Sequence, residues 1–390
     1  MVTREVSESM RRQIETNQGS PSFCTPAILS LLALLASGCT TGLGPYAVRA
    51  DRPDYNQQII QSANSEMLLN LVRLRYDDTP LFLELGAVVS QYSISSAING
   101  SGQATWPTWS GSGSLGGSLG YSESPTITYT PLAGEDFAER LLSPIPLDAI
   151  LLLVQTGWNV EHVLLLAMQR VNDLYNASSA TGPTPEAKPD YEEFADFVVR
   201  FARLHAAHLA GLNWEKQENE KQPPGRDPHF WIHSPTDPSS PLAADVQMVR
   251  RYLGLPAGRD DFELTGFPFN RRPGQVGMRC RSMLGVMHFL SSSVEPPPAD
   301  VANGLVTITR DQAGQPYDWS DLSGRLMKIR SAPDRPKEAY VAVPYRGSWF
   351  YIADDDRRSK ATFGLLNLLF SLQAATSKGK SPLLTLPVGR

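Results

Sequence analysis

The chain has 390 residues, of which 41% are hydrophobic and 19% charged, a balance that excludes an intrinsically disordered polypeptide and allows a large buried core. It carries 35 Lys and Arg against 40 Asp and Glu, with a formal net charge of -5. Because no long block of one sign occurs, we expect neither a nucleic-acid partner nor a polybasic membrane surface. Two stretches, 16–48 and 85–122, contain no charged residue.

The first uncharged stretch has the order of a secretory signal. Residues 27–36 read AILSLLALLA, follow Arg11 and Arg12, and precede two small residues. A bilayer span needs about 20 apolar residues, so this run is too short for a permanent transmembrane helix. Residues 35–39 read Leu-Ala-Ser-Gly-Cys. This motif resembles the lipobox of bacterial lipoproteins, in which the cysteine becomes the lipid-modified N-terminus of the mature chain.

The resemblance implies a signal peptide over 1–38, acyl chains such as palmitate on Cys39, and a short tether over 39–52. It also implies sorting to the outer membrane, because Thr40 rather than Asp follows the cysteine. The partner would be membrane lipid held through the acyl anchor, with the domain facing the periplasm. The alternative is a plain signal peptide with an incidental cysteine. Translation from Met10 would give a more typical signal than translation from Met1.

Cysteine usage agrees with export. Cys24 and Cys39 lie in or beside the signal, so Cys280 would be the lone cysteine of the mature chain. A lone cysteine cannot form an internal disulfide, and the domain must therefore fold on its hydrophobic core.

An amphipathic helix is predicted over 55–76, where apolar residues recur at steps of three and four. Residues 77–80, Asp-Asp-Thr-Pro, end this helix. Residues 81–85 then begin the first strand of a hairpin, so that 53–87 forms the N-terminal helix and the strand root.

The second uncharged stretch lies within a predicted Gly/Ser-rich β-hairpin over 88–130. Apolar residues take even positions in 88–101 and odd positions in 114–130, with small or polar residues between them. Period two predicts strands with one apolar and one polar face. Pairing residues whose numbers sum to 213 puts the apolar residues on one side, with Trp106 and Trp109 at the tip. The predicted pairs are Tyr92 with Tyr121, Ile94 with Leu119, and Ile98 with Leu115.

One interpretation of these features is a membrane-inserting hairpin. Residues 92–101 match the roughly 9–11 needed for a tilted transmembrane strand. The six paired apolar residues would face lipid, the Tyr and Trp residues would lie at the two interfaces, and the polar face would line water. Since a barrel needs about eight strands, at least about four copies would have to contribute. In architecture, this is similar to the curli-type export lipoproteins, whose subunits donate hairpins to a shared barrel.

The alternative for 88–130 is a soluble Gly/Ser-rich arm that packs on its own domain or on a neighbour. Glycine weakens strands, and Glu123 falls on the apolar face, which would end the membrane segment at Tyr121.

Three short motifs resemble nucleotide or catalytic sites but lack the required context. Residues 111–116 match a dinucleotide fingerprint, and residues 116–120 match a nucleophile elbow, yet both need a helix to follow. Residues 379–381 lack the upstream glycine of a phosphate loop. We therefore expect no cofactor and no catalytic residues.

Four histidines have a spacing that could hold zinc: His205 and His208 on a predicted helix, and His229 and His233 beyond it. No His-Glu-x-x-His motif accompanies them, and ordinary surface or core histidines are the favoured interpretation.

The remainder predicts a mixture of helices and strands. A helical part over 131–212 would contain helices at 146–154, 159–175 and 190–212, with a linker at 177–189. A Pro-rich exposed excursion would follow over 213–240. The C-terminal part, 241–390, would contain helices at 246–253, 281–291 and 354–374, strands at 305–309, 326–329 and 383–386, and a hairpin at 340–352.

Local signals mark the ends and faces of several of these elements. Asn159 would cap the helix at 159–175, and Gly254 would end the helix at 246–253. The hairpin would turn at 346–347, Arg-Gly, and the acidic residues 354–356 would cap the last helix. The apolar side of the helix at 190–212 would consist of Phe194, Phe197, Val198 and Phe201.

The sequence thus predicts an α+β domain with a projecting β-hairpin. The leading functional interpretation is an outer-membrane lipoprotein that forms a homo-oligomer, with a β-barrel pore for export or envelope transport. One alternative is a monomeric periplasmic lipoprotein that acts as a scaffold or accessory subunit for envelope proteins. A metal-dependent hydrolase is the third.

Overall fold

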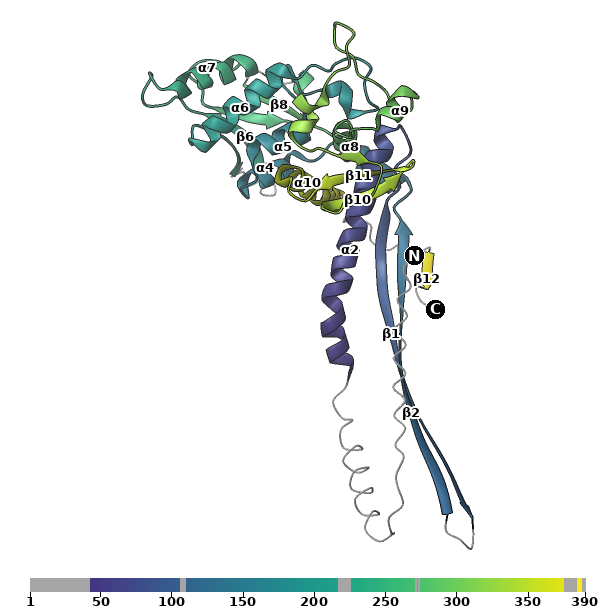
Figure 1. The fold of residues 1–390 in the computed structure, drawn as a ribbon. Helices are drawn as coiled ribbons and strands as arrows, with labels where there is room; N and C mark the ends of the chain where they lie inside the picture. The colour runs from purple at the N-terminus through teal and green to yellow at the C-terminus, as the bar shows by residue number, and fades with distance from the viewer. Residues whose placement is uncertain are drawn as a thin grey trace. The chain divides into compact units, whose positions relative to one another are not determined.

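The computed structural model describes residues 43–105, 110–216, 226–270, 272, 274–374 and 384–387. The predicted signal peptide and Cys39 lie outside these residues, as do Trp106 and Trp109 at the expected hairpin tip. The fold is α+β with a long β-hairpin, as predicted (Figure 1). Its elements divide into two compact units, one formed by 1–57, 83–131 and 381–390, and the other by 58–82 and 132–380.

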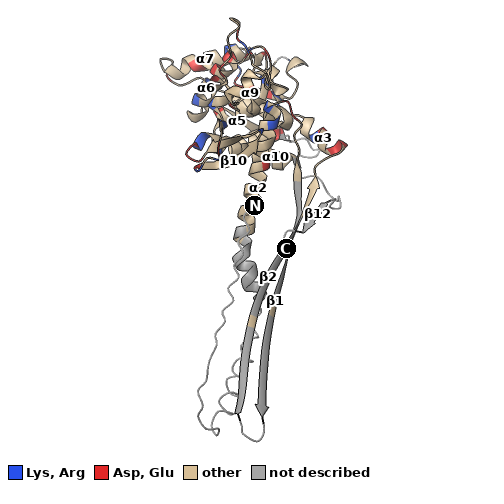
Figure 2. Cartoon of the chain, turned by 45° about the vertical axis from the view of Figure 1, so that its right-hand side comes forward, with Lys and Arg blue, Asp and Glu red and all other residues tan. Residues whose placement is uncertain are grey.

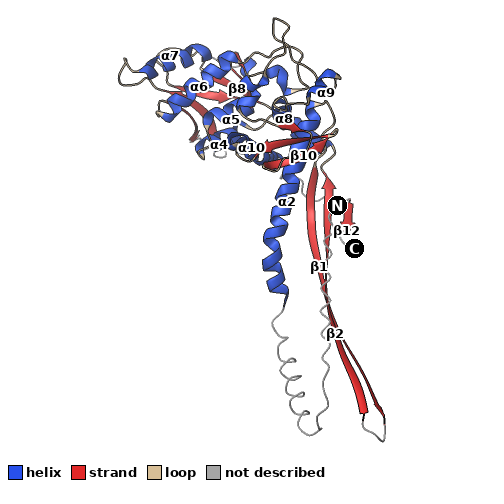
Figure 3. Cartoon of the chain, in the orientation of Figure 1, coloured by secondary structure: helices blue, strands red, loops and turns tan. Residues whose placement is uncertain are grey.

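The first unit contains the hairpin. Strands β1 (Leu83–Thr105) and β2 (Ser110–Pro131) pair antiparallel along their whole length, with one irregularity between Leu85 and Ala87. Strand β12 (Leu384–Pro387), close to the predicted final strand, pairs antiparallel with β2, so that the sheet order is β1-β2-β12. Figure 3 shows the hairpin as two continuous strands.

Helix α2 (Leu43–Arg75) confirms the helix predicted over 55–76. It begins earlier than expected, so residues 43–52 of the expected tether are helical. The helix ends at Arg75, and Asp77 takes a left-handed conformation with φ 56°.

The second unit is built on a six-stranded mixed sheet in the order β4-β3-β8-β7-β6-β5. Strands β7 and β8 are parallel, and every other neighbouring pair is antiparallel. The strands are β3 (Met168–Val171), β4 (Leu174–Tyr175), β5 (Ala210–Lys216), β6 (Arg226–Ile232), β7 (Asp261–Thr265) and β8 (Gln275–Cys280).

Three helices of this unit, α4, α5 and α6, contact the six-stranded sheet and bury apolar residues in the core. Helix α6 buries Phe194, Phe197, Val198 and Phe201, the residues predicted to form its apolar side. Phe201 stacks on Phe230 of β6 at 5.7 Å between ring centroids. The helices are α3 (Glu135–Leu142), α4 (Leu147–Gln155), α5 (Val160–Ala167), α6 (Glu192–Ala206), α7 (Pro241–Leu253), α8 (Met283–Ser291), α9 (Pro298–Ala302) and α10 (Arg357–Ala374).

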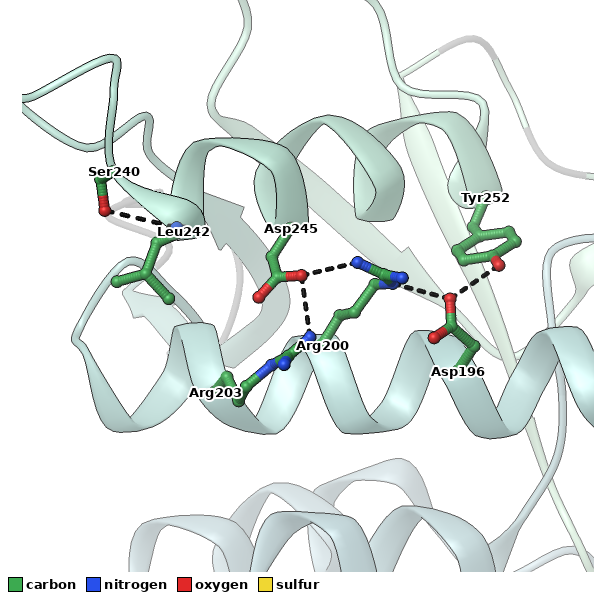
Figure 4. Close-up of polar contacts among 7 residues, drawn as sticks. All are labelled: Asp196, Arg200, Arg203, Ser240, Leu242, Asp245 and Tyr252. Carbon is green, nitrogen blue, oxygen red and sulfur yellow. Dashed lines mark hydrogen bonds and ion pairs between the residues drawn. The ribbon is translucent and has the colours of Figure 1, made fainter.

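Helices α6 and α7 are joined by ion pairs (Figure 4). Asp245 of α7 is buried and accepts hydrogen bonds from Arg200 at 2.7 Å and Arg203 at 2.9 Å. Two cations therefore satisfy one buried carboxylate. At the other end of the contact, Tyr252 donates to Asp196 at 2.8 Å, and the hydrogen bond from Arg200 holds the pKa of Asp196 below its usual range.

A second, three-stranded sheet has the order β10-β11-β9, with β9 (Arg330–Ala332), β10 (Ala339–Tyr345) and β11 (Ser348–Ala353). The hairpin predicted around Arg346 and Gly347 is confirmed. Both turn residues have positive φ, 47° and 81°, as a two-residue hairpin turn of the type I′ class requires.

Asp356 accepts a hydrogen bond from the Ser359 backbone N–H at the start of α10, which confirms the predicted capping role of the acidic triplet.

Several predicted elements are wrong. The helix expected over 159–175 begins at its predicted cap Asn159 but ends at Ala167, because the same apolar run continues as the buried strand β3. The exposed excursion expected over 213–240 instead includes most of β5 and all of β6, whose aromatic residues pack in the core. The strand expected at 305–309 is irregular, and 326–329 contributes only an isolated bridge at Ile329.

Candidate membrane-facing hairpin and a candidate ligand cavity

The hairpin register differs from the predicted one by two residues. From Ala87 to Thr105, paired residues have numbers that sum to 215 rather than 213. The last pair of the ladder is Thr105 with Ser110, so the turn is centred one residue later than expected. A shift by an even number preserves the alternation, and the six apolar positions still fall on one face. The observed pairs are Tyr92 with Glu123, Ile94 with Tyr121, Ser96 with Leu119, Ile98 with Gly117, and Gly100 with Leu115.

This register defines where the uncharged part of the hairpin begins. Glu123 lies opposite Tyr92, and every pair from Ser93–Ser122 to Thr105–Ser110 lacks a charged residue. Residues 93–105 extend about 41 Å at about 3.4 Å per residue, which corresponds to about 29–33 Å along a barrel axis at a tilt of about 35–45°. The hydrocarbon core of a bilayer is about 30 Å thick.

The edges of this segment are unpaired within the described residues. Strand β12 covers only Thr126 to Tyr129 of β2. No other described strand pairs with 88–105 of β1 or with 110–125 of β2. An isolated two-stranded hairpin is marginally stable in water, and exposed edges can pair with another chain. Ser95 and Ser118, whose positions lie on the polar face, are exposed.

Two of the short motifs are placed in a context that excludes their suggested roles. Residues 111–116 and 116–120 lie inside β2, so neither forms a strand-to-helix turn. Residues 379–381 are outside the described part of the chain. Among the described helices, none is long and apolar enough to cross a bilayer.

Three of the four histidines contact separate partners. His205 lies 3.2 Å from the Ala210 carbonyl oxygen, while His229 and His233 contact the carboxylates of Asp261 at 2.7 Å and Asp260 at 3.2 Å. His208 has a positive φ of 56° just after α6. Within the described ranges, no group of three or more His, Cys, Asp or Glu side chains could hold a metal ion. Charged residues of both signs are interspersed over the second unit (Figure 2).

Cys280 is buried in β8, and this burial raises the pKa of its thiol to about 12. The thiolate is the reactive form of cysteine, so this side chain is chemically inert near neutral pH.

A cavity in the second unit was not suggested by the sequence. Its volume is about 280 Å³, and its lining includes Arg75 at the end of α2, Trp319, and Lys328. These residues are far apart in sequence, and the only local signal was an arginine on the apolar side of a predicted helix. The other lining residues used below are Val294, Glu295, Val301, Ile308, Tyr317 and Asp318.

Comparison with known proteins found no matching family model, no matching curated protein and no matching solved structure.

Proposed function

We propose that this protein is an outer-membrane lipoprotein that assembles into a homo-oligomer, and that its hairpins form a shared β-barrel pore for export or envelope transport. One observation carries the proposal: an unbroken ladder of uncharged pairs, 93–105 with 110–122, has both outer edges unpaired among the described residues. Backbone groups in lipid must all be hydrogen-bonded, so such a segment can enter a membrane only when neighbouring copies complete the sheet.

The distribution of residue types along this ladder supports the assignment of its two faces. One face carries the apolar positions together with small residues. The other face consists of Ser, Gly, Asn, Gln, Thr and a single Ala. Alternation of lipid-facing and lumen-facing residues is the pattern of transmembrane barrels. The apolar positions within the uncharged ladder are Ile94, Ile98, Leu115, Leu119 and Tyr121, and Tyr92 lies at its boundary opposite Glu123.

The number of copies follows from the strand count. Each copy supplies two strands, so the smallest barrel of about eight strands requires about four copies. A water-filled channel comparable to that of porins, with about 16–18 strands, requires about eight or nine copies. The acyl group on Cys39 would hold each copy at the membrane before assembly.

The experiment is a size measurement of the full-length protein after expression in a bacterium with an outer membrane and extraction in mild detergent. Light scattering on a sizing column should give at least about four copies, and negative-stain images should show rings. The matched control deletes 93–122 and joins Tyr92 to Glu123 through a short Gly-Ser turn, which keeps the hairpin root. This variant should be monomeric.

A monomeric wild-type protein would contradict the proposal. It would favour the alternative of a periplasmic lipoprotein that uses 88–130 as a docking arm for another envelope protein.

A further inference from the structure

Arg75 is a buried cation without a carboxylate partner in the described part of the chain. Its side chain is 4% exposed, and Nη1 donates to the Thr307 carbonyl oxygen at 3.0 Å and to the Thr184 hydroxyl at 3.4 Å. Its Nε is buried and has no hydrogen-bond partner. Burial lowers the pKa of this guanidinium, while the nearby Asp77 acts in the opposite direction. A buried charge normally requires pairing, so this arrangement leaves binding capacity unused.

The unused capacity has a defined geometry. Both hydrogen bonds that Arg75 donates to the described residues use Nη1, which leaves the edge formed by Nε and Nη2 without a partner among them. A guanidinium edge presents two parallel N–H groups, and this spacing matches the two oxygens of a carboxylate.

Arg281, a second buried arginine of this unit, also has an Nε without a hydrogen-bond partner, but unlike Arg75 it uses both terminal nitrogens. Its side chain is 1% exposed and donates to the carbonyl oxygens of Leu165, Leu166 and Met168 through Nη1, and to that of Asn176 through Nη2. Arg281 does not line the cavity that includes Arg75.

A second orphan donor lines the cavity with Arg75. Trp319 is 9% exposed, and its indole Nε1 is buried without a hydrogen-bond partner. Its ring packs against Tyr317 edge to face, with 5.3 Å between centroids. Val294, Val301 and Ile308 add apolar walls. The cavity therefore combines a cation and an N–H donor with an apolar surface, which is the general composition of a small-molecule site.

The remaining charges limit the charge of the ligand. Lys328 and two exposed carboxylates, Glu295 and Asp318, also line the cavity. With Arg75, the lining holds two cations and two anions, so a dianion such as phosphate is disfavoured relative to a monoanion. The volume of about 280 Å³ lies just below the range for ligand pockets, about 300–1,000 Å³, which restricts the ligand to a small molecule.

We propose that this cavity binds a small organic monocarboxylate with an apolar body, whose carboxylate is held by the Nε–Nη2 edge of Arg75 and the indole N–H of Trp319. The apolar body lies against Tyr317 and the aliphatic walls. The carboxylate can belong to a free acid or to the last residue of a peptide, because both present the same group. This site is independent of the hairpin and does not depend on the pore.

The test is isothermal titration of the full-length protein in detergent with sodium phenylacetate. Saturable binding is expected, with binding at least about tenfold weaker for phenylacetamide, which lacks the charge, and for inorganic phosphate. N-acetyl-phenylalanine, a free acid, and a tripeptide ending in phenylalanine distinguish the two sources. If the cavity wall is closed beyond the apolar body of the ligand, the free acid should bind and the tripeptide should not. Absence of saturable phenylacetate binding by the folded wild-type protein would overturn the proposal.

Two variants test the named donors. Arg75→Lys retains the charge but loses the two-pronged edge, and Trp319→Phe retains the ring but loses the N–H group. Each should weaken phenylacetate binding by about tenfold or more, while Arg251→Lys, an exposed substitution on α7, should bind as wild type does. Circular dichroism establishes that each variant is folded. Folded Arg75→Lys and Trp319→Phe variants that bind with wild-type affinity would contradict the assignment.

Discussion

Placing one arginine on either face of the hairpin separates a membrane strand from a soluble arm. Residues 93–105 form the uncharged part of β1, and Ile98 and Asn99 are adjacent at its centre. Ile98 belongs to the apolar face and pairs with Gly117, whereas Asn99 belongs to the polar face and pairs with Gly116. The two substitutions Ile98→Arg and Asn99→Arg therefore add the same charge at the same depth on opposite faces.

The expected costs differ strongly. An arginine facing lipid at the midplane of a barrel costs about 2–4 kcal/mol, and lumen-facing positions tolerate charge. For Ile98→Arg this corresponds to about a 30- to 1,000-fold loss in the insertion equilibrium for each copy. An assembly of about four copies would lose about 8–16 kcal/mol, which is enough to abolish it. In a soluble arm, both substitutions would be exposed and nearly neutral.

The assay is flotation of the purified variants with liposomes, followed by sizing in detergent. Ile98→Arg should remain monomeric and attached to the liposomes only through its acyl chains, while Asn99→Arg should insert and assemble. Equal insertion of the two variants would refute the register-based assignment of faces, and failure of both would show that charge alone, irrespective of face, disrupts the assembly.

Three further predictions concern the anchor and the folded unit. Cys39→Ser should remove the mass of the acyl chains, as judged by mass spectrometry of the fractionated protein, and an unchanged mass would contradict lipidation. Combined with Ile98→Arg, which blocks insertion of the hairpin, it should also release the protein from membranes. Arg281→Met should lower the free energy of unfolding by about 3–5 kcal/mol, because four carbonyl oxygens each lose a hydrogen bond, although those of Leu165 and Met168 keep the Asn176 side-chain amide as a donor. Arg251→Met at an exposed site should change it little. Denaturant titration measures both, and equal stability would argue against this role. Burial lowers the pKa values of His162 and His288, so the unfolded chain binds more protons, and stability should fall as the pH drops through about 6.5 toward the lower folded-state values. A folded His288→Leu variant should show a shallower decline between pH 7 and pH 5, and an unchanged slope would count against the histidine.

Local patterns in the sequence predicted much of the fold. The spacing of Phe194, Phe197 and Phe201 identified the buried face of α6, and Asn159 and Gly254 marked a helix start and a helix end as the structure has them. These signals succeed because capping and helical periodicity depend on a few neighbouring residues.

Features that depend on distant residues were not predictable in the same way. The strands flanking 217–225 contain a proline and several charged residues, and packing against Phe262 and the helices makes Phe230 a core residue. Predicting the hairpin register requires the position of the turn, whereas predicting the alternation of residues along each strand does not. The two faces were therefore predicted correctly, but the predicted pairs differ from the observed ones by two residues. The cavity at Arg75 joins segments separated by more than 200 residues, and its orphan donors become visible only in three dimensions.

Thiol accessibility along β1 tests the central claim, that one face of the hairpin meets lipid and the other meets water. Single cysteines introduced from 93 to 105 in liposome-inserted protein would be treated with a membrane-impermeant maleimide. Cys280 contributes little background because it is buried and its thiol pKa is raised to about 12. The account predicts labelling of Asn99→Cys and the other odd positions, with protection of Ile98→Cys and the other even positions. Equal labelling of both sets would contradict it.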